Sequence, residues 1–413
     1  MELGRLCQPP AGFARCRTIT RLKLALISHG APDDPRHFSG IPWHVLQELR
    51  RQGHRVEPFY GEPTNWAKQV AHYKNLWSLK LSRQPHNFAA DAGILRTRST
   101  TMDKKILEFA PDAVLCVGLP EAAISLSTNL PLYVWMDAFY PSLRRFYAYF
   151  RDYYSEQDAR VLQRIEGDVL QRARKIWLSS VWAKKEAATD FPKAAMRMAT
   201  QSFGANLENP PTNAEVEQAI TARNLATPTL LFLANEWERK GGDAAVETVR
   251  RLRAKGCQAK LVVIGLKDRP ASAPEETWLE WVGPLDKSKP AEARRLRECF
   301  LTSAFLLLPS IADCTPIVCH EAGAHGLPVL ATNVGGLPST VTNGESGQLW
   351  PPAQFAEEAP AWITAALASR TRYETYAQAA RRRYENFGNW TVNVRAVIDT
   401  IAADLAQPQP IVV

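Results

Sequence analysis

The stretch that decides the fold is IADCTPIVCHEAGAHGLPVLAT, residues 311–332. It places Asp313 and Glu321 eight positions apart, among many small residues. A core helix has no use for two acids, and a solvated helix has no use for so much alanine and glycine. The apolar run FLLLPS (305–310) precedes the acids and LPVLAT (327–332) ends the stretch. This pattern predicts a strand, an acidic loop, a short helix and a second strand.

Similar apolar, β-branched runs recur along the whole chain, each followed by turn or helix signals. They lie at 22–28, 112–118, 131–136 and 175–180 in the first half, and at 229–234, 259–265, 305–310 and 327–332 in the second. Helical periodicity fills the gaps, as in GDAAVETVRRLRAKG (242–256), which ends on a glycine. Alternating strands and helices predict an α/β fold whose parallel sheets are covered on both faces.

The length of 413 residues predicts two domains rather than one core. Pro, Asn and Gly cluster in 204–217, which marks the boundary. We therefore expect a disordered lead-in at 1–20, an N-terminal Rossmann-like domain at 21–207, a C-terminal Rossmann-like domain at 208–385, and a helix at 386–413 that packs back on the first domain. Two such lobes facing a cleft place ligands at the carboxyl ends of their strands.

The helix of the opening stretch is expected to use Thr315 as its N-cap and Pro316 as its first residue. Its free N–H groups and its dipole then point at the loop, where they can hold a diphosphate. The carboxylates of Asp313 and Glu321 reach the same place and can accept hydrogen bonds from hydroxyl groups. Sugars and ribose carry such hydroxyls, so the arrangement predicts a nucleoside-diphosphate sugar as the ligand.

The segment 309–341 resembles the Glu-x7-Glu signature of glycosyltransferase family 4, whose members are retaining enzymes with the two-lobed GT-B fold. Asp313 stands at the first Glu and Glu321 at the second. Gly335 and Gly336 in NVGGLP (333–338) match the loop that approaches the donor. Further similar stretches are NEWERKGGD (235–243), WVGPLDK (281–287), SSVWAKKEA (179–187) and FGAN (203–206).

The resemblance implies that the domain at 21–207 binds the acceptor and the domain at 208–385 binds the nucleotide sugar. It also implies roles for particular residues. The catalytic candidates are Asp313, Glu321, Lys240 and Asp137, and the donor-binding candidates are Arg239, Thr315, Gly335, Gly336, Val282, Gly283 and Gly40. Two departures stand out. Asp313 is one methylene shorter than the family's Glu, and Asn235 replaces an arginine that often precedes the phosphate-site lysine. The second departure weakens the case for a clamp of two cations on the diphosphate.

Each candidate also has an ordinary structural interpretation. Glu321 would then be a buried structural carboxylate, although an unpaired one is costly. Asp313 would be a loop acid near a helix start, Lys240 an exposed surface lysine, and Asp137 a strand cap. The two adjacent glycines would form a tight turn, and the lone Gly40 is weak evidence for a ligand. His29 and His320 are interpreted as an ordinary loop histidine and an ordinary helix histidine.

The sequence predicts neither a metal nor a cofactor. The metal-binding Asp-x-Asp motif of the other main glycosyltransferase fold is missing from the sequence, and Cys314 and Cys319 flank the site without a third ligand. The seven cysteines show no metal-ligand spacing, which indicates reduced thiols in a cytoplasmic protein. No apolar run approaches the ~20 residues that cross a bilayer.

The net charge of +8 is uneven. Residues 1–200 carry 29 Lys and Arg against 19 Asp and Glu, and residues 201–413 carry 21 against 23. This excess suggests a membrane surface, an anionic acceptor or nucleic acid as a partner of the first half, or simply a basic, soluble surface. Within it, PSLRRFYAYFRDYY (141–154) mixes arginines and aromatics. We interpret this segment as a contact with an anionic membrane, with a cleft wall for acceptor sugars and a plain amphipathic helix as alternatives.

These observations predict a metal-independent, retaining hexosyltransferase. It would move a sugar from a nucleoside-diphosphate sugar to a saccharide or lipid-linked acceptor in cell-surface polysaccharide or glycolipid synthesis, at the inner membrane face and without a nucleic-acid partner. One alternative is a nucleotide-sugar epimerase of the same fold, which needs no acceptor. The other is a non-catalytic binder of anionic lipid or nucleic acid, which the charge of the first half motivates.

Overall fold

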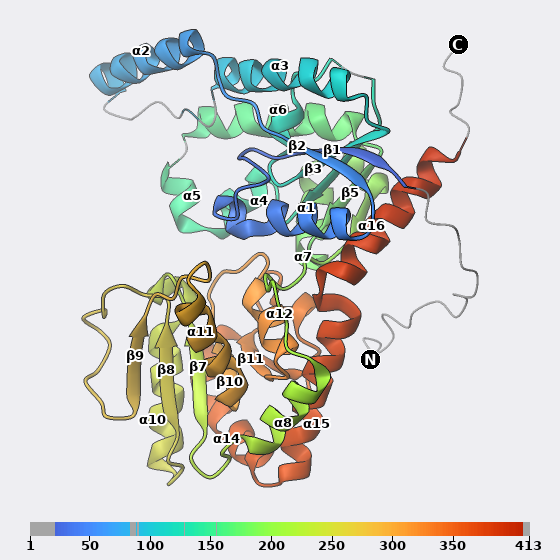
Figure 1. Ribbon diagram of the computed structural model, residues 1–413. Coiled ribbons are helices and arrows are strands. Elements are labelled where there is room, and N and C mark those ends of the chain that lie inside the picture. Colours follow the sequence, from blue (N-terminus) through green and yellow to red (C-terminus); the bar gives the residue numbers. More distant parts are fainter. Residues whose placement is uncertain (1–20, 83–87, 89–90, 128, 154, 408–413) are drawn as a thin grey trace.

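The computed structural model describes residues 21–407 except 83–87, 89–90, 128 and 154. The expected lead-in at 1–20 and the last residues, 408–413, lie outside the described residues. The described chain forms two α/β lobes, one above the other in Figure 1. Residues 201–212 join them, and the boundary that we placed after residue 207 falls in this segment.

The first lobe is a parallel sheet of six strands in the order β2-β1-β3-β4-β5-β6. The strands are β1 Lys23–Ile27, β2 Arg55–Phe59, β3 Ala113–Val117, β4 Leu132–Met136, β5 Lys175–Leu178 and β6 Met198–Thr200. The helices are α1 Ile41–Arg51, α2 Asn65–Ser82, α3 Ala92–Phe109, α4 Tyr140–Phe146, α5 Ala148–Tyr153, α6 Glu156–Arg172 and α7 Val181–Asp190. Every residue of β3 and β4 is buried, as expected for strands covered on both faces.

The second lobe is a parallel sheet in the order β12-β11-β10-β7-β8-β9. Its strands are β7 Thr229–Leu233, β8 Lys260–Ile264, β9 Leu279–Gly283, β10 Phe305–Leu308, β11 Val329–Thr332 and β12 Gly347–Trp350. Its helices are α8 Asn213–Ala222, α9 Trp237–Lys240, α10 Gly242–Ala254, α11 Pro290–Thr302, α12 Ile317–Ala324, α13 Leu337–Thr340, α14 Phe355–Leu367 and α15 Arg370–Arg383. The predicted α/β fold with two Rossmann-like lobes is confirmed.

The last helix, α16 Trp390–Leu405, crosses from the second lobe back to the first (Figure 1). Gln52, which follows α1, donates a hydrogen bond to the Thr391 carbonyl at 3.0 Å. Arg174, which precedes β5, reaches Asp404 at 3.2 Å. The apolar face of α16 joins the core of the first lobe; its buried residues are Trp390, Val394, Val397, Ile398 and Ile401. Helix α16, from the C-terminal part of the chain, thus packs into the core that the N-terminal lobe forms.

The start of this helix differs from expectation. We expected one helix from residue 386, but a π-helical turn, Tyr384–Gly388, continues α15. Asn389 then caps α16 by accepting a hydrogen bond from the Val392 N–H. Gly388, at the end of this turn, packs so closely on α12 that a side chain there would meet His320 at 2.8 Å.

Candidate functional site

The order of the second sheet locates a crevice. The chain runs outward from β7 to β8 and β9 on one side, and from β10 to β11 and β12 on the other. Loops that follow β7 and β10 therefore diverge, and ligands of such sheets bind at the carboxyl ends of these two strands. The loop after β7 leads into α9, which carries Arg239 and Lys240, and the loop after β10 carries Asp313.

An ion pair lies where these two loops diverge, at the topological switch point of the second sheet. The Lys240 ammonium donates to Asp313 Oδ2, and their side chains are only 13% and 7% exposed. Two residues 73 positions apart in the sequence thus meet where the sheet topology predicts a ligand. Two buried charges are costly to desolvate and are stable here because each has the other as its partner.

Glu321 lies on the buried side of α12 and forms the second ion pair of the site. The Lys287 ammonium donates to Glu321 Oε1 and, at 3.2 Å, to the Asn206 carbonyl. Glu321 is 6% exposed and Lys287 is 45% exposed, so this pair faces the solvent more than the first one does. Both predicted acids are therefore buried, and each is neutralised by a lysine.

The Glu321 pair borders a space between the lobes. A cavity of about 640 Å³ is lined by Gly40 and His44 of the first lobe, by Asn206, and by Lys287 and residues of α11. Asn206 links the two sides, because its amide nitrogen donates to the Ser39 carbonyl at 2.6 Å. Gly40 caps α1 with a φ of +77°, a left-handed conformation that favours glycine. The structure brings Gly40 to the same cavity as the Glu321 pair.

The helix that carries Glu321 starts later than expected. α12 begins at Ile317, and Pro316 is its N-cap with a ψ of 85°, so the predicted start at Thr315 is wrong. The reason is a contact between the lobes: the Thr315 hydroxyl pairs with the Ser179 hydroxyl of the first lobe instead of capping the helix. Thr315 is still next to the Asp313 loop, where it holds the two lobes together.

The two glycines after β11 pack on the acidic loop. A side chain at Gly335 would lie 2.2 Å from the Asp313 carbonyl oxygen, and one at Gly336 would lie 1.9 Å from that of Cys314. The Gly336 N–H also donates to the Asp313 carbonyl at 2.8 Å. These two positions must therefore be glycines because they lie against the backbone of the Asp313 loop.

Residues of the segment 141–154 cover this loop from the first lobe. The Tyr147 hydroxyl accepts a hydrogen bond from the Cys314 N–H at 2.9 Å, and the Arg239 guanidinium lies 5.6 Å from the Tyr147 ring centroid. Arg144 pairs with Glu156, and Arg145 pairs with Glu186 and Asp190. Tyr147 therefore faces the second lobe, whereas Tyr149 is 51% exposed, and the interpretation of this segment as a membrane contact stays a prediction.

Arg239 points inward but mainly supports the loop. It pairs with Glu236 at 2.8 Å and donates to the Ala312 carbonyl at 3.1 Å. Asn235, which stands in place of the family's arginine, lies 3.5 Å from the Arg239 guanidinium. Arg239 thus fixes the backbone next to Asp313 rather than leaving a free cation.

Asp137 follows β4 on the first lobe, and its Oδ1 accepts from the Ala138 N–H at 2.8 Å. Burial raises the pKa of this carboxyl to about 6, and the negative charge of Asp313 across the lobes adds to the rise. An acid whose pKa lies near neutrality at the end of a strand is a candidate for chemistry.

Val282 and Gly283 lie farther from the two ion pairs. They end β9, an edge strand two positions from β7 in the sheet, and Gly283 has a φ of +81°. The Gly283 carbonyl accepts from the Gly265 N–H at 2.9 Å. The structure records no contact between these two residues and Asp313, Glu321 or Lys240 in the described part of the chain.

The first sheet has its own switch point, between β1 and β3. A small cavity there is lined by Ser28, His29, Arg98 and Glu121, among others. Each of these four has a buried polar atom without a hydrogen-bond partner in the described structure: Ser28 Oγ, His29 Nδ1, Arg98 Nε and Glu121 Oε2. Burial raises the pKa of Glu121 to about 7 and lowers that of His29 to about 4. Unpaired polar groups are expensive in an interior, so the cavity suits a polar occupant.

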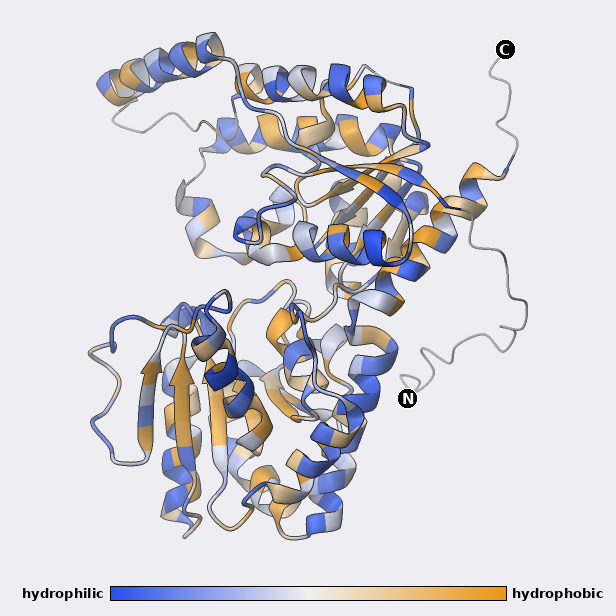
Figure 2. Cartoon of the chain, in the orientation of Figure 1, coloured by the Kyte–Doolittle hydropathy of each residue, from blue (hydrophilic) through white to orange (hydrophobic). Residues whose placement is uncertain are grey.

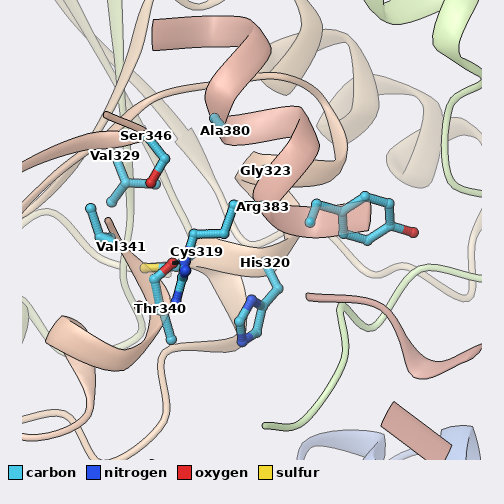
Figure 3. Close-up of a pocket in the computed structure, with 10 residues that line it drawn as sticks. Cys319, His320, Gly323, Val329, Thr340, Val341, Ser346, Ala380 and Arg383 are labelled. Atoms are coloured by element: carbon cyan, nitrogen blue, oxygen red, sulfur yellow. Dashed lines mark hydrogen bonds between the residues drawn. The ribbon is translucent and has the colours of Figure 1, made fainter. Parts of the chain in front are cut away.

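A further cavity is lined by residues of α12 and α15 (Figure 3), and its lining includes no residue of the two ion pairs. Cys319 and His320 line it, and Arg383 enters it from α15. The Arg383 guanidinium donates to the Ser339 carbonyl at 2.6 Å and to the Thr340 carbonyl at 2.9 Å. With a volume of about 10 Å³ this space holds one water at most, and its arginine links α15 to α13.

The cysteines and histidines of the region are structural. Burial raises the pKa of the Cys319 thiol to about 12 and lowers that of His320 to about 3. His320 Nε2 lies 3.0 Å from the Ser202 hydroxyl, across the junction of the lobes. Within the described ranges, no three His, Cys, Asp or Glu side chains gather as a metal site would require.

Sequence reasoning missed Lys287, Asn206 and Tyr147 as site residues. The first two lie in stretches that carry the family resemblance, WVGPLDK and FGAN, so the resemblance was a usable signal for them. Tyr147 had no such signal. Its contact with Cys314 exists only because the two lobes meet.

Comparisons with known proteins agree with this geometry. Residues 227–367 match the family described as glycosyl transferases group 1. A D-inositol 3-phosphate glycosyltransferase of Xylanimonas cellulosilytica is 29% identical over 203 residues, which cover 46% of this chain and 47% of that protein. The chain thus aligns with about half the length of this curated relative, and with 33% of a second one, from Rhodococcus erythropolis.

Two solved structures share the whole two-lobed architecture. Sucrose-phosphate synthase of Thermosynechococcus elongatus has a TM-score of 0.64 at 18% identity, covering 94% of this chain and 100% of that one. HepE of Anabaena in complex with UDP has a TM-score of 0.59 at 14% identity, covering 92% and 100%. At these identities the likeness concerns the fold, and it confirms the GT-B arrangement of the two lobes.

Proposed function

We propose that this chain, whose residues 227–367 belong to the glycosyl transferases group 1, transfers a sugar from a nucleoside-diphosphate sugar to a hydroxyl acceptor with retention of configuration. The observation that carries the proposal is the pair of buried carboxylates, Asp313 and Glu321, each neutralised by a lysine beside the switch point of the second sheet. HepE, a structural neighbour, is known in complexes with UDP and with UDP-glucose, which supports a nucleotide-sugar donor.

The two ion pairs bind different parts of the donor. Glu321, next to the cavity between the lobes, accepts hydrogen bonds from the ribose hydroxyls, and Asp313 accepts them from the transferred sugar. Lys240 and Lys287 neutralise the diphosphate and stabilise the charge that develops as it leaves. A clamp on the diphosphate needs two cations, and Asn235 replaces the arginine that often provides one of them in the family. Lys287 provides this second cation here.

The transfer step needs no covalent enzyme intermediate. As the family resemblance implies, the bond from the anomeric carbon to the diphosphate oxygen breaks, and the acceptor oxygen bonds to the same face of that carbon. The proton of the acceptor hydroxyl passes to the leaving diphosphate. Asp137, across the lobes from Asp313, stabilises the positive charge of the sugar when it is ionised.

The cavity between the lobes, of about 640 Å³, has room for a hydroxyl-bearing acceptor. The cavity at β1 and β3, whose Ser28, His29 and Glu121 atoms lack partners in the described structure, measures about 10 Å³ and holds one water at most. The relatives named above act, by name, on D-inositol 3-phosphate, a polyol. Polysaccharide and lipid-linked acceptors at the membrane face, which the sequence predicts, present the same chemistry.

The proposal is tested by incubating the protein with UDP-, GDP- and ADP-sugars, each with and without polyol, oligosaccharide and glycolipid acceptors, in EDTA. Release of nucleoside diphosphate that depends on an acceptor and persists in EDTA supports it. Loss of transfer on chelation, restored by manganese or magnesium, contradicts the metal-free mechanism.

The same assay separates the alternative functions. Conversion of the donor into an isomeric nucleotide sugar without any acceptor identifies an epimerase. Failure of every nucleotide and nucleotide sugar to raise the melting temperature, combined with binding of anionic lipid or nucleic acid, identifies a non-catalytic binder, because a ligand of the folded state stabilises it.

A further inference from the structure

Helix α2 carries a concentration of exposed large hydrophobic side chains. Fourteen such side chains are exposed among the described residues; six of them lie on α2 and a seventh, Phe88, follows it. These seven are Trp66, Tyr73, Leu76, Trp77, Leu79, Leu81 and Phe88. Isolated apolar residues on a surface need no explanation, but a cluster of this size marks a contact surface.

The aromatic residues of α2 form one stripe. Trp66, Tyr73 and Trp77 are spaced by seven and four residues, which places them on one face of a helix. Their exposed fractions are 70%, 63% and 61%. The helix packs on the lobe through its small residues, Ala67 and Ala71, which are buried against Ile94 of α3. The packing of α2 is therefore complete without the aromatic stripe.

The surroundings of the stripe are basic. α2 carries Lys68, Lys74 and Lys80 and has no acidic residue. The Lys80 ammonium lies 5.8 Å from the Trp77 ring centroid. Lys74 pairs with Asp91 at the start of α3. The helix also belongs to the half of the chain that carries a net charge of +10, from 29 Lys and Arg against 19 Asp and Glu.

The figures place this helix where a flat surface can reach it. α2 lies at the outer edge of the first lobe and extends past its neighbours (Figure 1). Apolar residues alternate with polar ones along its visible surface (Figure 2). The stripe is separate from the two ion pairs, which lie at the junction of the lobes.

We propose that α2 docks on an anionic membrane surface. Tryptophan, tyrosine and leucine enter the boundary between headgroups and acyl chains, and lysines around them bind lipid phosphates. The lysines favour a membrane over a protein partner, because lysine is depleted in protein–protein interfaces while aromatic residues are enriched in both. In the described part of the chain, none of the helices is both long and apolar enough to span a bilayer, so this contact is peripheral.

The docking surface is separate from the one that the sequence suggested at 141–154, whose Tyr147 packs on the second lobe. It does not depend on the proposed transfer reaction, since docking requires neither donor nor acceptor. A failure to bind lipid would leave the two ion pairs of the donor site unaffected, and a failure to transfer sugar would leave the membrane surface unaffected.

Vesicle flotation tests the proposal with the full chain, with vesicles of phosphatidylcholine alone and of phosphatidylcholine with phosphatidylglycerol. Wild type is expected to float with the anionic vesicles at low salt and to be released as salt rises, because the attraction is screened. The double variant Trp66→Ser/Trp77→Ser should partition about tenfold less, since both indoles leave the interface. Lys80→Gln should lose about fivefold, the equivalent of ~1 kcal/mol per basic residue.

Met196→Ser is the matched control, because Met196 is 95% exposed on the same lobe but outside α2, and it should float like wild type. The proposal is overturned if wild type ignores anionic vesicles at low salt, or if the folded double variant floats like wild type. It is also overturned if light scattering finds two chains in wild type and one in the double variant, since the stripe would then join two copies. If the double variant does not fold, Lys80→Gln decides alone.

Discussion

Gly336→Ala is the substitution for which the structure predicts the sharpest effect. The φ of Gly336 is −83°, so alanine fits the backbone, and only space is lacking. The new methyl group would lie 1.9 Å from the Cys314 carbonyl oxygen, and side-chain carbons essentially never come closer than 3.0 Å to such an atom. The difference means that the Cys314 carbonyl must retreat by about 1.1 Å.

That retreat moves the acid that the proposal assigns to the transferred sugar. Asp313 is the neighbour of Cys314, and its carbonyl accepts from the Gly336 N–H, so loop and carboxylate shift together. A displacement of about 1 Å in a reacting geometry costs roughly 100-fold in turnover. Overpacking of a filled interior costs about 1–3 kcal/mol of unfolding free energy as well.

The assay compares donor turnover and urea unfolding for wild type, Gly336→Ala and a control, Gly167→Ala. Gly167 lies in α6, where the nearest atom to a new methyl group, in Phe191, is 3.7 Å away, an ordinary contact. The control should keep both turnover and stability. A folded Gly336→Ala protein with the turnover of wild type would refute the packing argument, because the Asp313 loop would then tolerate the shift or lie elsewhere.

Three other substitutions probe the neighbouring groups. Asp313→Asn should lower kcat more than it weakens donor binding, since its carboxylate is assigned to the transferred sugar; equal losses in both would make it a simple binding residue. Lys287→Met should weaken nucleotide diphosphate binding about tenfold, whereas a loss of stability with normal binding would reduce Lys287 to a partner of Glu321. For Asp137, whose pKa rises from 3.8 to about 6 on folding, the folded state holds the proton more tightly, so wild type should lose stability as pH rises through that window. Asp137→Asn should abolish this slope and the rise of kcat/KM near pH 6, and an unchanged profile would show that another group titrates.

The strands that the sequence predicted and the strands that it missed differ in one physical respect. The eight predicted strands are the interior strands of the two sheets, which are buried on both faces and therefore read as continuous apolar runs. The four missed ones, β2, β6, β9 and β12, are the sheet edges. β2 reads RVEPF, with alternate residues exposed and a proline, so its sequence lacks the signal of a buried strand.

The candidate site shows the same division. Asp313, Glu321 and Lys240 were recognisable because small residues and strand ends surround them in the sequence. The partnership of Lys287 with Glu321, and the contact of Tyr147 with Cys314, depend on how elements far apart in the chain pack. The late start of α12 has the same origin, since the Thr315 hydroxyl bonds to the other lobe.

The most direct test of the donor site is calorimetric titration of UDP-glucose and of free nucleoside diphosphates into wild type and Glu321→Ala. Wild type should bind one nucleotide sugar, and Glu321→Ala should bind it with about 1–3 kcal/mol less free energy, as for the loss of a hydrogen bond to a charged group. Unfolding of both proteins, followed in parallel, separates loss of the ligand contact from loss of the fold. Equal affinities in two folded proteins, or no nucleotide binding by wild type, would contradict the assignment of Glu321 and Asp313 to a nucleotide-sugar site.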